Sequence, residues 1–537
     1  MNLVLSKLYK MKTVKFIFLT LFISTVGYTQ NVNLSNGEVF DGEPFLAINP
    51  NQPQQMVVAW MGYLPLNQLV IKIRTTVDAG QNWSEITTIP HKKPIYTSAD
   101  PSVEFDNNGN VYLAYVDYSH ALDSGAVYLR KSVDGGLNWG EAVEVITMHA
   151  EVENKKPIDR PWMAIDKSGG DTDGNIYITT MNALKGFPLV TAPYHPYFMR
   201  STDGGNSFST WQHLDTDGWI AGNIIRGAMA NPTVSANGTL HIVYPSWYFP
   251  QSFYPQFFIA SSANAGTSFE RNLITPIANN FSDELAKKGY LLIADPSNNL
   301  HLAFINLEAE YGDGDVFLRE SFDAGANWTE FERVNDDPIE NNRMQDLVWA
   351  DFDQDGDLVV SWRDRRNAPD STYTTSTEIW AAVKCKDSSH FSTNFIISDL
   401  SVAHDTILEG AGNDFMCIAF ENDTINAVWG DTRDGKLNIW FQRIKKDGSF
   451  LSIQKIASET NPIINVYPNP ATNELHITGQ EILEITLYNQ TGKMVYQTKN
   501  KNTIESITVN VNTLEKGMYY VKVKTKQGIV LKNWIKL

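Results

Sequence analysis

The chain has 537 residues, of which 12% are aromatic, and a formal net charge of −18 at pH 7. A chain of this length exceeds one typical domain, so we expect more than one. The acidic balance disfavours nucleic-acid binding, because phosphate groups must be neutralised by Lys and Arg. The two cysteines, Cys385 and Cys417, exclude a disulfide framework and a cysteine-based zinc site. They could pair with each other, but we expect both to be free, buried thiols.

Residues 1–30 have the pattern of a secretory signal peptide. Lysines between Lys7 and Lys15 precede the apolar run 16–26, and residues 27–30 form the cleavage zone. The apolar run is too short to span a bilayer. No later segment is long and apolar enough either, so we expect no transmembrane segment after cleavage of the signal.

From about residue 40 a hairpin pattern recurs along the chain. Asp100–Asp106 and Val111–Tyr115, for example, are two β-rich runs joined by the turn Asn107–Asn110. Seven copies can be aligned between residues 40 and 455, two of them without a good motif after the hairpin. The last two copies begin at Asp346 and Asp414.

The first five hairpins are followed by the motif Ser/Thr-x-Asp/Asn-x-Gly-x-x-Trp/Phe. Its copies are 76–83, 132–139, 201–208, 262–269 and 321–328. The Asp side chain can accept hydrogen bonds from backbone N–H groups further along the turn, and the Gly permits a positive φ. Such a turn closes a third strand onto a fourth, which predicts repeated four-stranded antiparallel sheets.

Repeated sheets of this kind predict an all-β protein, and in particular a β-propeller. We favour seven blades, with six as the alternative because two copies are degenerate. A strand within residues 31–40 would complete the last blade and close the ring. The repeated motif resembles the Asp-box of the sialidase-like (BNR repeat) propeller superfamily, and we assign residues 31–460 to that domain.

The resemblance places any active site on one face of the ring. In sialidase-like propellers this face carries the starts of the first strands and the loops between second and third strands, whereas the Asp-box turns lie on the opposite face. The first-strand starts of this chain offer the following polar residues: Glu43, Asp100, Asp159, Arg160, Arg226, Arg343, Asp346 and Asp414.

Several arginines on that face could converge on a substrate carboxylate, because the guanidinium fork binds carboxylates in a bidentate manner. The predicted substrate-binding residues are Arg160, Trp162, Arg226, Trp247, Arg343, Arg365, Arg366 and Arg433. Two loops share the form Trp-x-Asp-x-Arg, at 362–366 and 429–433. The alternative for these loops is a local Asp–Arg ion pair that only stiffens the turn.

The resemblance to sialidases also implies an Asp acid/base and a Tyr nucleophile. We therefore predict Asp117, Asp364 or Asp431 as acid/base and Tyr118 or Tyr248 as nucleophile. The chain departs from the family where an Arg-Ile-Pro motif is expected, because Glu43-Pro44-Phe45 stands there. Ordinary sialidase activity is thereby placed in doubt. We expect a glycoside hydrolase or lyase acting on acidic glycans or glycoconjugates; the alternative is a surface propeller that binds carbohydrate or protein without catalysis.

No organic cofactor is indicated, but one stretch has the composition of a calcium loop. Asp351, Asp353, Asp355 and Asp357 alternate with other residues and surround Gly356. The Glu expected at the twelfth position is replaced by Trp362. A plain turn between two strands is the alternative to a Ca²⁺ site.

Residues 461–537 have the pattern of a separate β-rich unit. Its features are the opening Tyr467-Pro-Asn-Pro470, a turn at 489–492, the stretch 514–520 and a basic end. These resemble the type A C-terminal sorting domain of the type IX secretion system. The resemblance implies a small β-sandwich, recognition by the secretion machinery, and a protein that is secreted or attached to the cell surface. A carbohydrate-binding module is the alternative.

Overall fold

The computed structural model describes residues 31–537 except 65–67, 153–154, 184–192, 216–228, 248–254, 277–288, 308–313, 373, 404–412, 452–463, 490–492 and 527–528. The predicted signal peptide therefore lies outside the described residues. The chain divides into two compact units, with the boundary between Leu451 and Ser452. All regular elements of the described residues are β-strands.

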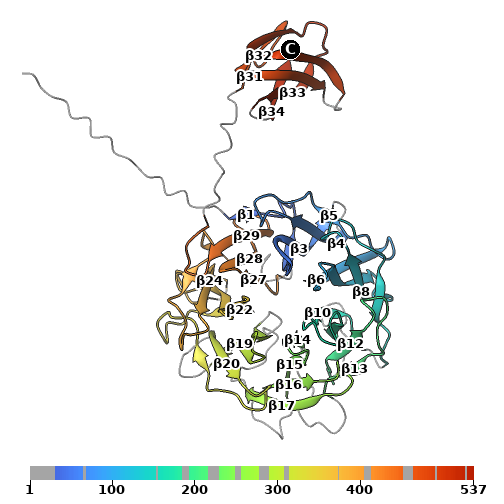
Figure 1. Ribbon diagram of the computed structural model, residues 1–537, viewed down its shortest axis with the longest axis vertical. Helices are drawn as coiled ribbons and strands as arrows, with labels where there is room; N and C mark the ends of the chain where they lie inside the picture. Colours follow the sequence, from blue (N-terminus) through green and yellow to red (C-terminus); the bar gives the residue numbers. More distant parts are fainter. Residues whose placement is uncertain are drawn as a thin grey trace, which may run out of the picture. The chain divides into compact units, whose positions relative to one another are not determined.

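The first unit is a ring of seven sheets, each with its first strand innermost (Figure 1). Blade 1 consists of β2 (Asp41–Asn49), β3 (Gln52–Leu64), β4 (Gln68–Thr76) and β5 (Thr87–Thr88). Blade 2 consists of β6 (Tyr96–Phe105), β7 (Val111–Ser119), β8 (Gly125–Ser132) and β9 (Val143–Thr147). Blade 3 consists of β10 (Asp159–Ile165), β11 (Ile176–Met181), β12 (Tyr197–Ser201) and β13 (Gln212–His213).

The ring continues with three blades of the same design. Blade 4 consists of β14 (Asn231–Val234), β15 (Leu240–Ser246), β16 (Gln256–Ser262) and β17 (Glu270–Pro276). Blade 5 consists of β18 (Tyr290–Ala294), β19 (Leu300–Leu307), β20 (Gly314–Ser321) and β21 (Glu332–Arg333). Blade 6 consists of β22 (Gln345–Phe352), β23 (Leu358–Asp364), β24 (Ser376–Lys384) and β25 (Phe395–Ile396), and β26 (Val402–Ala403) also pairs with β24.

The seventh blade joins the two ends of the ring. It contains β27 (Cys417–Glu421), β28 (Thr424–Asp431) and β29 (Asn438–Lys445), and its outermost strand is β1 (Val32–Asn33). Val32 pairs with Phe441 and Asn33 with Trp440 in antiparallel register. The described residues thus form seven blades closed by an N-terminal strand, and the prediction of a seven-bladed all-β propeller is confirmed.

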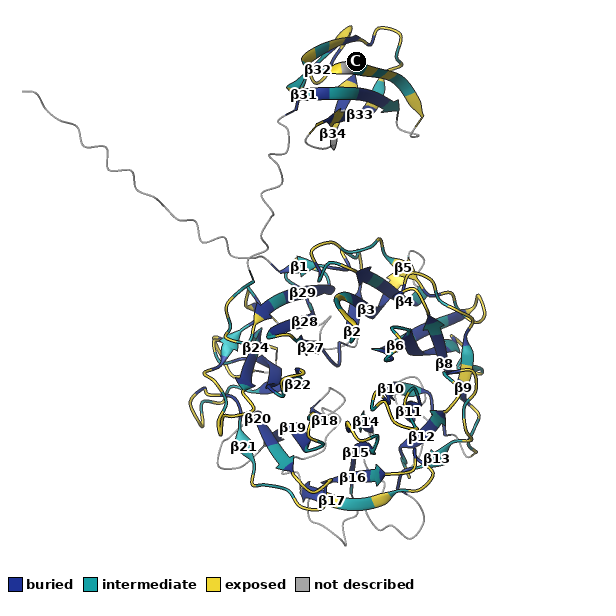
Figure 2. Ribbon diagram, in the orientation of Figure 1, coloured by how far each residue is buried: buried dark blue, intermediate teal, exposed yellow. Residues whose placement is uncertain are grey.

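The core lies between the blades, so the second strand of a blade is buried on both faces (Figure 2). In β3, Val58 and Trp60 pack into the cluster shared with blades 6 and 7, whereas Val57 and Ala59 pack into the cluster shared with blade 2. Alternate side chains of a strand point to opposite faces, so a continuous apolar run fits this position.

The Asp-box turns have the predicted hydrogen bonds. In the second turn, Ser132 Oγ donates to Asp134 Oδ1 at 2.8 Å, and the Asn138 backbone N–H donates to the same oxygen at 2.9 Å. Gly136 has φ 89°, and a Cβ there would lie 2.9 Å from Val57 of blade 1. The turns therefore pack against the preceding blade, a structural role.

The two cysteines are both free, as expected. Cys417 is buried, but Cys385 is exposed, so the expectation of two buried thiols is wrong for Cys385. Cys385 follows directly after β24, where the chain turns at the surface. The residues that follow Cys385 are also exposed, so no hydrophobic core surrounds its thiol.

The second unit contains β30 (Asn465–Tyr467), β31 (Glu474–Asn489), β32 (Met494–Asn510), β33 (Gly517–Thr525) and β34 (Ile529–Lys536). They are linked as one sheet, in which the long β31 pairs with β30 and β32 at its start and with β32 and β33 at its end. Leu475, Ile485, Val521 and Trp534 belong to its own buried core. This unit is the predicted small C-terminal β-fold.

Candidate functional site

The innermost strands of three successive blades begin with the same backbone distortion. Glu43, Asp100 and Arg160 each precede a proline and have φ of 56°, 52° and 46°. The pairing register of each strand shifts at that point. A non-glycine residue at positive φ costs on the order of 1 kcal/mol, and such strain concentrates at functional sites. These β-bulges redirect the side chains at the start of each strand.

The redirected side chains meet at the centre of the ring. Arg160 of blade 3 forms an ion pair with Asp414, which directly precedes blade 7. Because blades 3 and 7 are not neighbours, this pair crosses the ring axis. Glu43 and Asp159 both lie within hydrogen-bonding range of the Asp100 carboxyl group. We refer to these five residues as the axial cluster.

The axial cluster contains four carboxyl groups and a single guanidinium, that of Arg160. Burial, reinforced by the negative charges of Asp100 and Asp414, raises the pKa of Glu43 well above its ordinary value. Burial also raises the pKa of Asp159 to about 7, although Arg160 opposes that shift. Burial alone would lower the pKa of Arg160, but the surrounding carboxylates, Asp414 first, raise it. The cluster therefore retains protons on some carboxyl groups near neutral pH.

The cluster also presents polar atoms that are not satisfied internally. Glu43 Oε2 and Arg160 Nε are buried and have no hydrogen-bond partner among the described residues. Tyr118, at the end of β7, lies near Asp100 and Asp159, and its pKa is raised first by burial and then by these acids. The predicted nucleophile Tyr118 thus lies at the cluster, as a neutral phenol that can donate a hydrogen bond.

Four aromatic rings lie next to the axial cluster along the innermost strands. Phe45, Trp162, Trp349 and Phe415 come from blades 1, 3, 6 and 7, and their ring centroids are 5.2 to 6.3 Å apart. Since blades 3 and 6 are not neighbours, the rings meet across the axis. Trp162, predicted to bind substrate, is only 4% exposed and belongs to this aromatic layer.

A central cavity of about 600 Å³ lies on the other side of the aromatic layer. Residues of every innermost strand line it, together with turn residues such as Ser168 and Gln354. The aromatic layer forms one end of this cavity through Phe45, Trp162 and Trp349. It separates the axial cluster from the cavity and provides the cluster with an apolar floor.

The three predicted acid/base residues occupy a different environment, at the ends of the second strands. Asp117, Asp364 and Asp431 are 0%, 1% and 6% exposed. Asp117 accepts hydrogen bonds from Ser98 Oγ at 2.9 Å and from the Lys92 backbone N–H at 2.7 Å. Each carboxylate thus accepts hydrogen bonds from donors of its own blade, and Asp117 also accepts one from the segment before blade 2.

The two Trp-x-Asp-x-Arg loops have the same set of contacts. The indole N–H of Trp362 donates to Asp364, and that of Trp429 donates to Asp431, at 2.6 and 2.9 Å. Two residues on, an arginine pairs with the same carboxylate. These contacts lie within the five residues at the end of each second strand.

The arginines of these loops are held by acids rather than directed at the axial cluster. Arg366 Nε donates to Asp364 at 2.9 Å, and its Nη1 donates to Asp336 at 2.7 Å. The Arg366 guanidinium lies 4.1 Å from the ring centre of Trp380. Arg365 is 1% exposed and forms an ion pair with Asp346 at 3.3 Å.

Arg433 repeats this arrangement in blade 7. Its Nε donates to Asp431 Oδ1 at 2.9 Å, its Nη1 donates to Asn31 Oδ1 at 2.9 Å, and it forms an ion pair with Asp399. The guanidinium lies 4.2 Å from the ring centre of Trp440. The local ion pair, the alternative considered from the sequence, is what both loops contain.

The remaining predicted sugar-site residues are more dispersed. Arg226 and Tyr248 lie outside the described residues. Trp247 follows β15 and is half-buried. Arg343 precedes β22, and its buried Nη1 has no hydrogen-bond partner in the part of the chain that the structure describes. Arg343 therefore remains a candidate to contact substrate.

The predicted calcium ligands divide into two sets. Asp351 accepts backbone N–H groups of Phe352 and Phe420 at 2.9 and 2.8 Å, and the side chain of Asp355 is exposed. Asp353 and Asp357 instead form a group with Asp423, whose ligand oxygens lie within 4.8 Å of one another. The sequence alone did not bring in Asp423, because it belongs to the next blade.

Four residues of the axial cluster, Glu43, Asp100, Asp159 and Asp414, were predicted only as polar residues on this face and not as catalytic residues. A usable signal was present, since a charged residue precedes proline at three successive strand starts. A non-glycine residue before proline normally adopts extended conformations. The positive φ that turns these side chains inward was therefore not predictable from the dipeptide.

The C-terminal unit has a match among known families. Residues 465–536 match the model of the secretion system C-terminal sorting domain. The tail is a secretion system sorting domain. The sorting domain makes the protein a type IX secretion substrate, secreted or attached to the cell surface. The described residues contain no helix of the length and hydrophobicity that a bilayer span requires.

The propeller is similar to several solved structures at low identity. A protein of unknown function from Dyadobacter fermentans is 14% identical, with 66% of this chain and 96% of that chain covered and a TM-score of 0.41. The GH93 α-L-arabinofuranosidase of Fusarium graminearum is 13% identical, covering 78% and 98%, with a TM-score of 0.43. The Hadza microbial sialidase Hz136 is 14% identical, covering 71% and 74%, with a TM-score of 0.40. No curated protein sequence matches the chain.

Proposed function

We propose that the propeller, exported by its sorting domain, is a glycoside hydrolase whose reaction takes place at the axial cluster. The observation that carries this proposal is the pairing of two unlike carboxyl groups. Asp159 has a pKa raised to about 7 by burial, whereas Asp414 is ion-paired with Arg160. Glycosidases generally use one protonated and one ionised carboxyl group, and carboxyl groups with separated protonation identify the acid and its partner.

In this proposal Asp159 is the general acid. It gives its proton to the glycosidic oxygen while the bond between that oxygen and the anomeric carbon breaks. The carboxylate of Asp414 stabilises the positive charge that develops on the sugar, either as a nucleophile or as the base that activates water. Water then supplies a hydroxyl to the anomeric carbon and a proton that restores Asp159. Tyr118 and the unpaired atoms of Glu43 and Arg160 hold sugar hydroxyls.

The charge of the cluster favours a neutral glycan over the acidic glycans expected from the family resemblance. A sialic acid or uronic acid would bring a further carboxylate to four carboxyl groups. The one guanidinium among them, Arg160, is already paired with Asp414. Like charges at close range are destabilising, so an anionic sugar at this position is disfavoured. The aromatic layer below the cluster supplies an apolar surface, as sugar sites commonly do.

The test is hydrolysis by the purified full chain of a panel of aryl glycosides and polysaccharides. The panel contains neutral pentosides and hexosides, sialosides and uronate polymers. We expect turnover of a neutral member, and kcat/KM lower by about 10²- to 10⁴-fold in Asp159→Asn and in Asp414→Asn. Loss of the Asp159 proton predicts that activity falls above about pH 7, and that Asp159→Asn abolishes this limb of the profile.

Two outcomes would contradict the proposal. Turnover that survives in both variants would place the chemistry elsewhere. Retention of a glycan by the wild-type protein without turnover of any panel member would support the non-catalytic binding propeller instead. Thermal unfolding of each variant controls for misfolding, and Asp117→Asn serves as the matched variant of a carboxylate outside the cluster.

A further inference from the structure

The turns between first and second strands repeat one hydrogen-bonding scheme in three blades. Asp106 Oδ1 accepts the backbone N–H groups of Asn108 and Asn110, both at 2.9 Å. Asp295 Oδ1 accepts two such groups at 2.8 Å in blade 5. In blade 6, Asp353 Oδ1 accepts the N–H groups of Asp355 and Asp357 at 3.1 and 3.0 Å. The three turns are therefore directly comparable.

The blade 6 turn differs from the other two at its fifth position. In blade 2, Asn110 Nδ2 donates to Asp106 Oδ2 at 2.7 Å, and in blade 5, Asn299 Nδ2 donates to Asp295 Oδ2 at 2.8 Å. Blade 6 has Asp357 at this position, and a carboxylate has no hydrogen to donate.

Because blade 6 has Asp357 where the other two turns have Asn, the Oδ2 of Asp353 lacks the side-chain donor that its counterparts have. Asp353 is 3% exposed, and its buried Oδ2 has no hydrogen-bond partner among the described residues. The turn therefore contains a buried acceptor that requires a positive charge or a proton.

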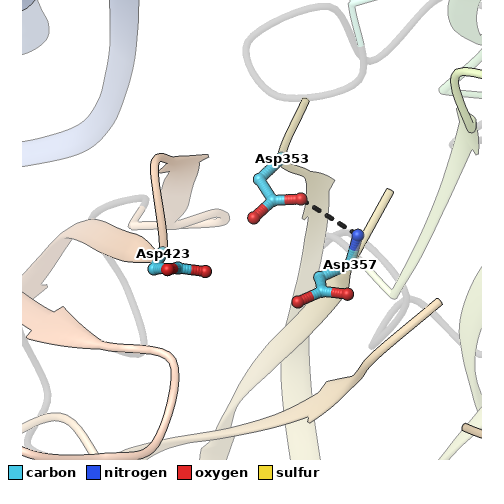
Figure 3. A group of neighbouring side chains, drawn as sticks. All are labelled: Asp353, Asp357 and Asp423. Carbon is cyan, nitrogen blue, oxygen red and sulfur yellow. Dashed lines mark hydrogen bonds between the residues drawn. The ribbon is translucent and has the colours of Figure 1, made fainter. Parts of the chain in front are cut away.

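A third carboxylate reaches the same place from the next blade. Asp423 lies in the turn between β27 and β28, and one ligand oxygen from each of Asp353, Asp357 and Asp423 lies within 4.8 Å of the others (Figure 3). In Figure 3 the free oxygen of Asp353 is turned toward the other two carboxylates. Two oxygens that each lie about 2.4 Å from one Ca²⁺ are at most about 4.8 Å apart.

We propose that Asp353, Asp357 and Asp423 bind a calcium ion that links blade 6 to blade 7. Oxygen ligands from carboxylates are those that Ca²⁺ prefers, and water completes its six to eight ligands. The site lies on the face of the strand 1–2 turns, so it is separate from the axial cluster. Its function is to join neighbouring blades, and it does not depend on the proposed hydrolase.

One side chain competes with the ion. Lys446 Nζ donates to Asp357 Oδ2 at 2.7 Å and forms an ion pair with Asp423 at 2.5 Å. Its single charge does not balance three carboxylates. The Lys446 side chain is 34% exposed, so its ammonium can move into solvent when the ion binds. Lys446 therefore lowers the affinity for calcium without excluding it.

The test measures calcium binding to the full chain after treatment with EDTA. Isothermal titration with CaCl₂ gives the Kd, and thermal unfolding is followed with and without about 10 mM CaCl₂. We expect the wild-type Tm to rise by at least about 2 °C in calcium. Lys446→Ala removes the competing ammonium and is expected to bind calcium about 10-fold more tightly.

Asp357→Asn is the informative loss-of-site variant, because it installs the residue that the matching turns of blades 2 and 5 carry. It supplies the missing donor to Asp353 Oδ2, so it is expected to fold without calcium and to lose the calcium response. Asp355→Asn removes one charge from the same turn but no ligand, and is expected to respond as the wild type does.

Two results would overturn the inference. If neither the wild type nor Lys446→Ala shows heat of binding or a Tm shift in calcium, Lys446 is the resident cation of this group. If Asp357→Asn keeps the wild-type response, calcium binds elsewhere on the chain. Assays of glycan hydrolysis do not enter either comparison, so the outcome is independent of the proposed function.

Discussion

Replacement of Arg433 by alanine separates a structural role from a substrate-binding role for the Trp-x-Asp-x-Arg loops. Arg433 is paired with Asp431 and Asp399, and the three side chains are 6%, 9% and 17% exposed. Removal of the guanidinium leaves both carboxylates largely buried without a counter-ion. Breaking a buried ion pair from one side typically costs about 3–5 kcal/mol. We expect Arg433→Ala to lose free energy of unfolding in this range.

The assay is equilibrium unfolding of the full chain in urea, followed by tryptophan fluorescence. The chain has 14 tryptophans, so the signal follows the unfolding of the protein as a whole. In Arg433→Ala, the carboxylates of Asp399 and Asp431 both lack a counter-ion. Adding Asp399→Asn removes one of these two unpaired charges. The double variant is therefore expected to recover about 1 kcal/mol or more. Arg366→Ala is the matched variant in blade 6, and it is expected to lose less, because its partner Asp336 is 43% exposed and that pair is screened by solvent.

The competing hypothesis makes the opposite prediction. If Arg433 binds a substrate carboxylate, Arg433→Ala raises KM for an anionic glycan and changes stability little. A loss of less than about 1 kcal/mol, accompanied by weaker glycan binding, would refute the structural interpretation. A large loss of stability with unchanged KM, measured well below the unfolding midpoint, supports it.

Three further predictions concern other parts of the molecule. Burial raises the pKa of Asp159 to about 7 in the folded state, so its stabilising contribution is complete below about pH 4 and is lost as the pH rises through 7. Asp159→Asn should therefore gain stability relative to wild type between about pH 4 and pH 7, by up to about 1.4 kcal/mol per pH unit, and a constant difference in unfolding free energy over that range would disprove this. Asp134→Ala removes the acceptor of an Asp-box turn and should lower stability by about 1–2 kcal/mol while kcat/KM stays constant, as a thermal scan and a rate assay can show together. Because the propeller has a core of its own, a chain ending at Leu451 should keep the wild-type Tm but fail to reach the culture medium; an insoluble product would speak against independent units.

The fold could be predicted from the sequence because its signals are local and repeated. Each hairpin pattern and each Asp-box turn lies within one blade, so the residues that determine the turn are close in sequence. The Oδ1 of Asp134 accepts the bond that the motif predicted. A strand within residues 31–40 was also predicted to complete the last blade, and β1 pairs with β29 in that place.

The candidate site could be predicted only as a face of the ring. The Arg160–Asp414 pair joins residues 254 positions apart, and no local pattern specifies that contact. Asp117 and Asp364 were chosen because they end second strands on that face, but packing makes them acceptors within their blades. Aspartate occurs both in the axial cluster and among the carboxylates that only accept hydrogen bonds within a blade. The residues that the fold places around a carboxylate decide whether its oxygens are occupied by hydrogen bonds within the blade or can contact a substrate.

The strand that completes the seventh blade makes closure of the ring depend on residues from both ends of the domain. Asn31 contacts Gln442 across 411 positions of the chain, and β1 has no partner until β29 exists. This pairing has a very high sequence separation, a property that slows folding. Loss of β1 would therefore remove the outermost strand of blade 7 and expose the edge of β29, a strand more than 400 residues further along the chain.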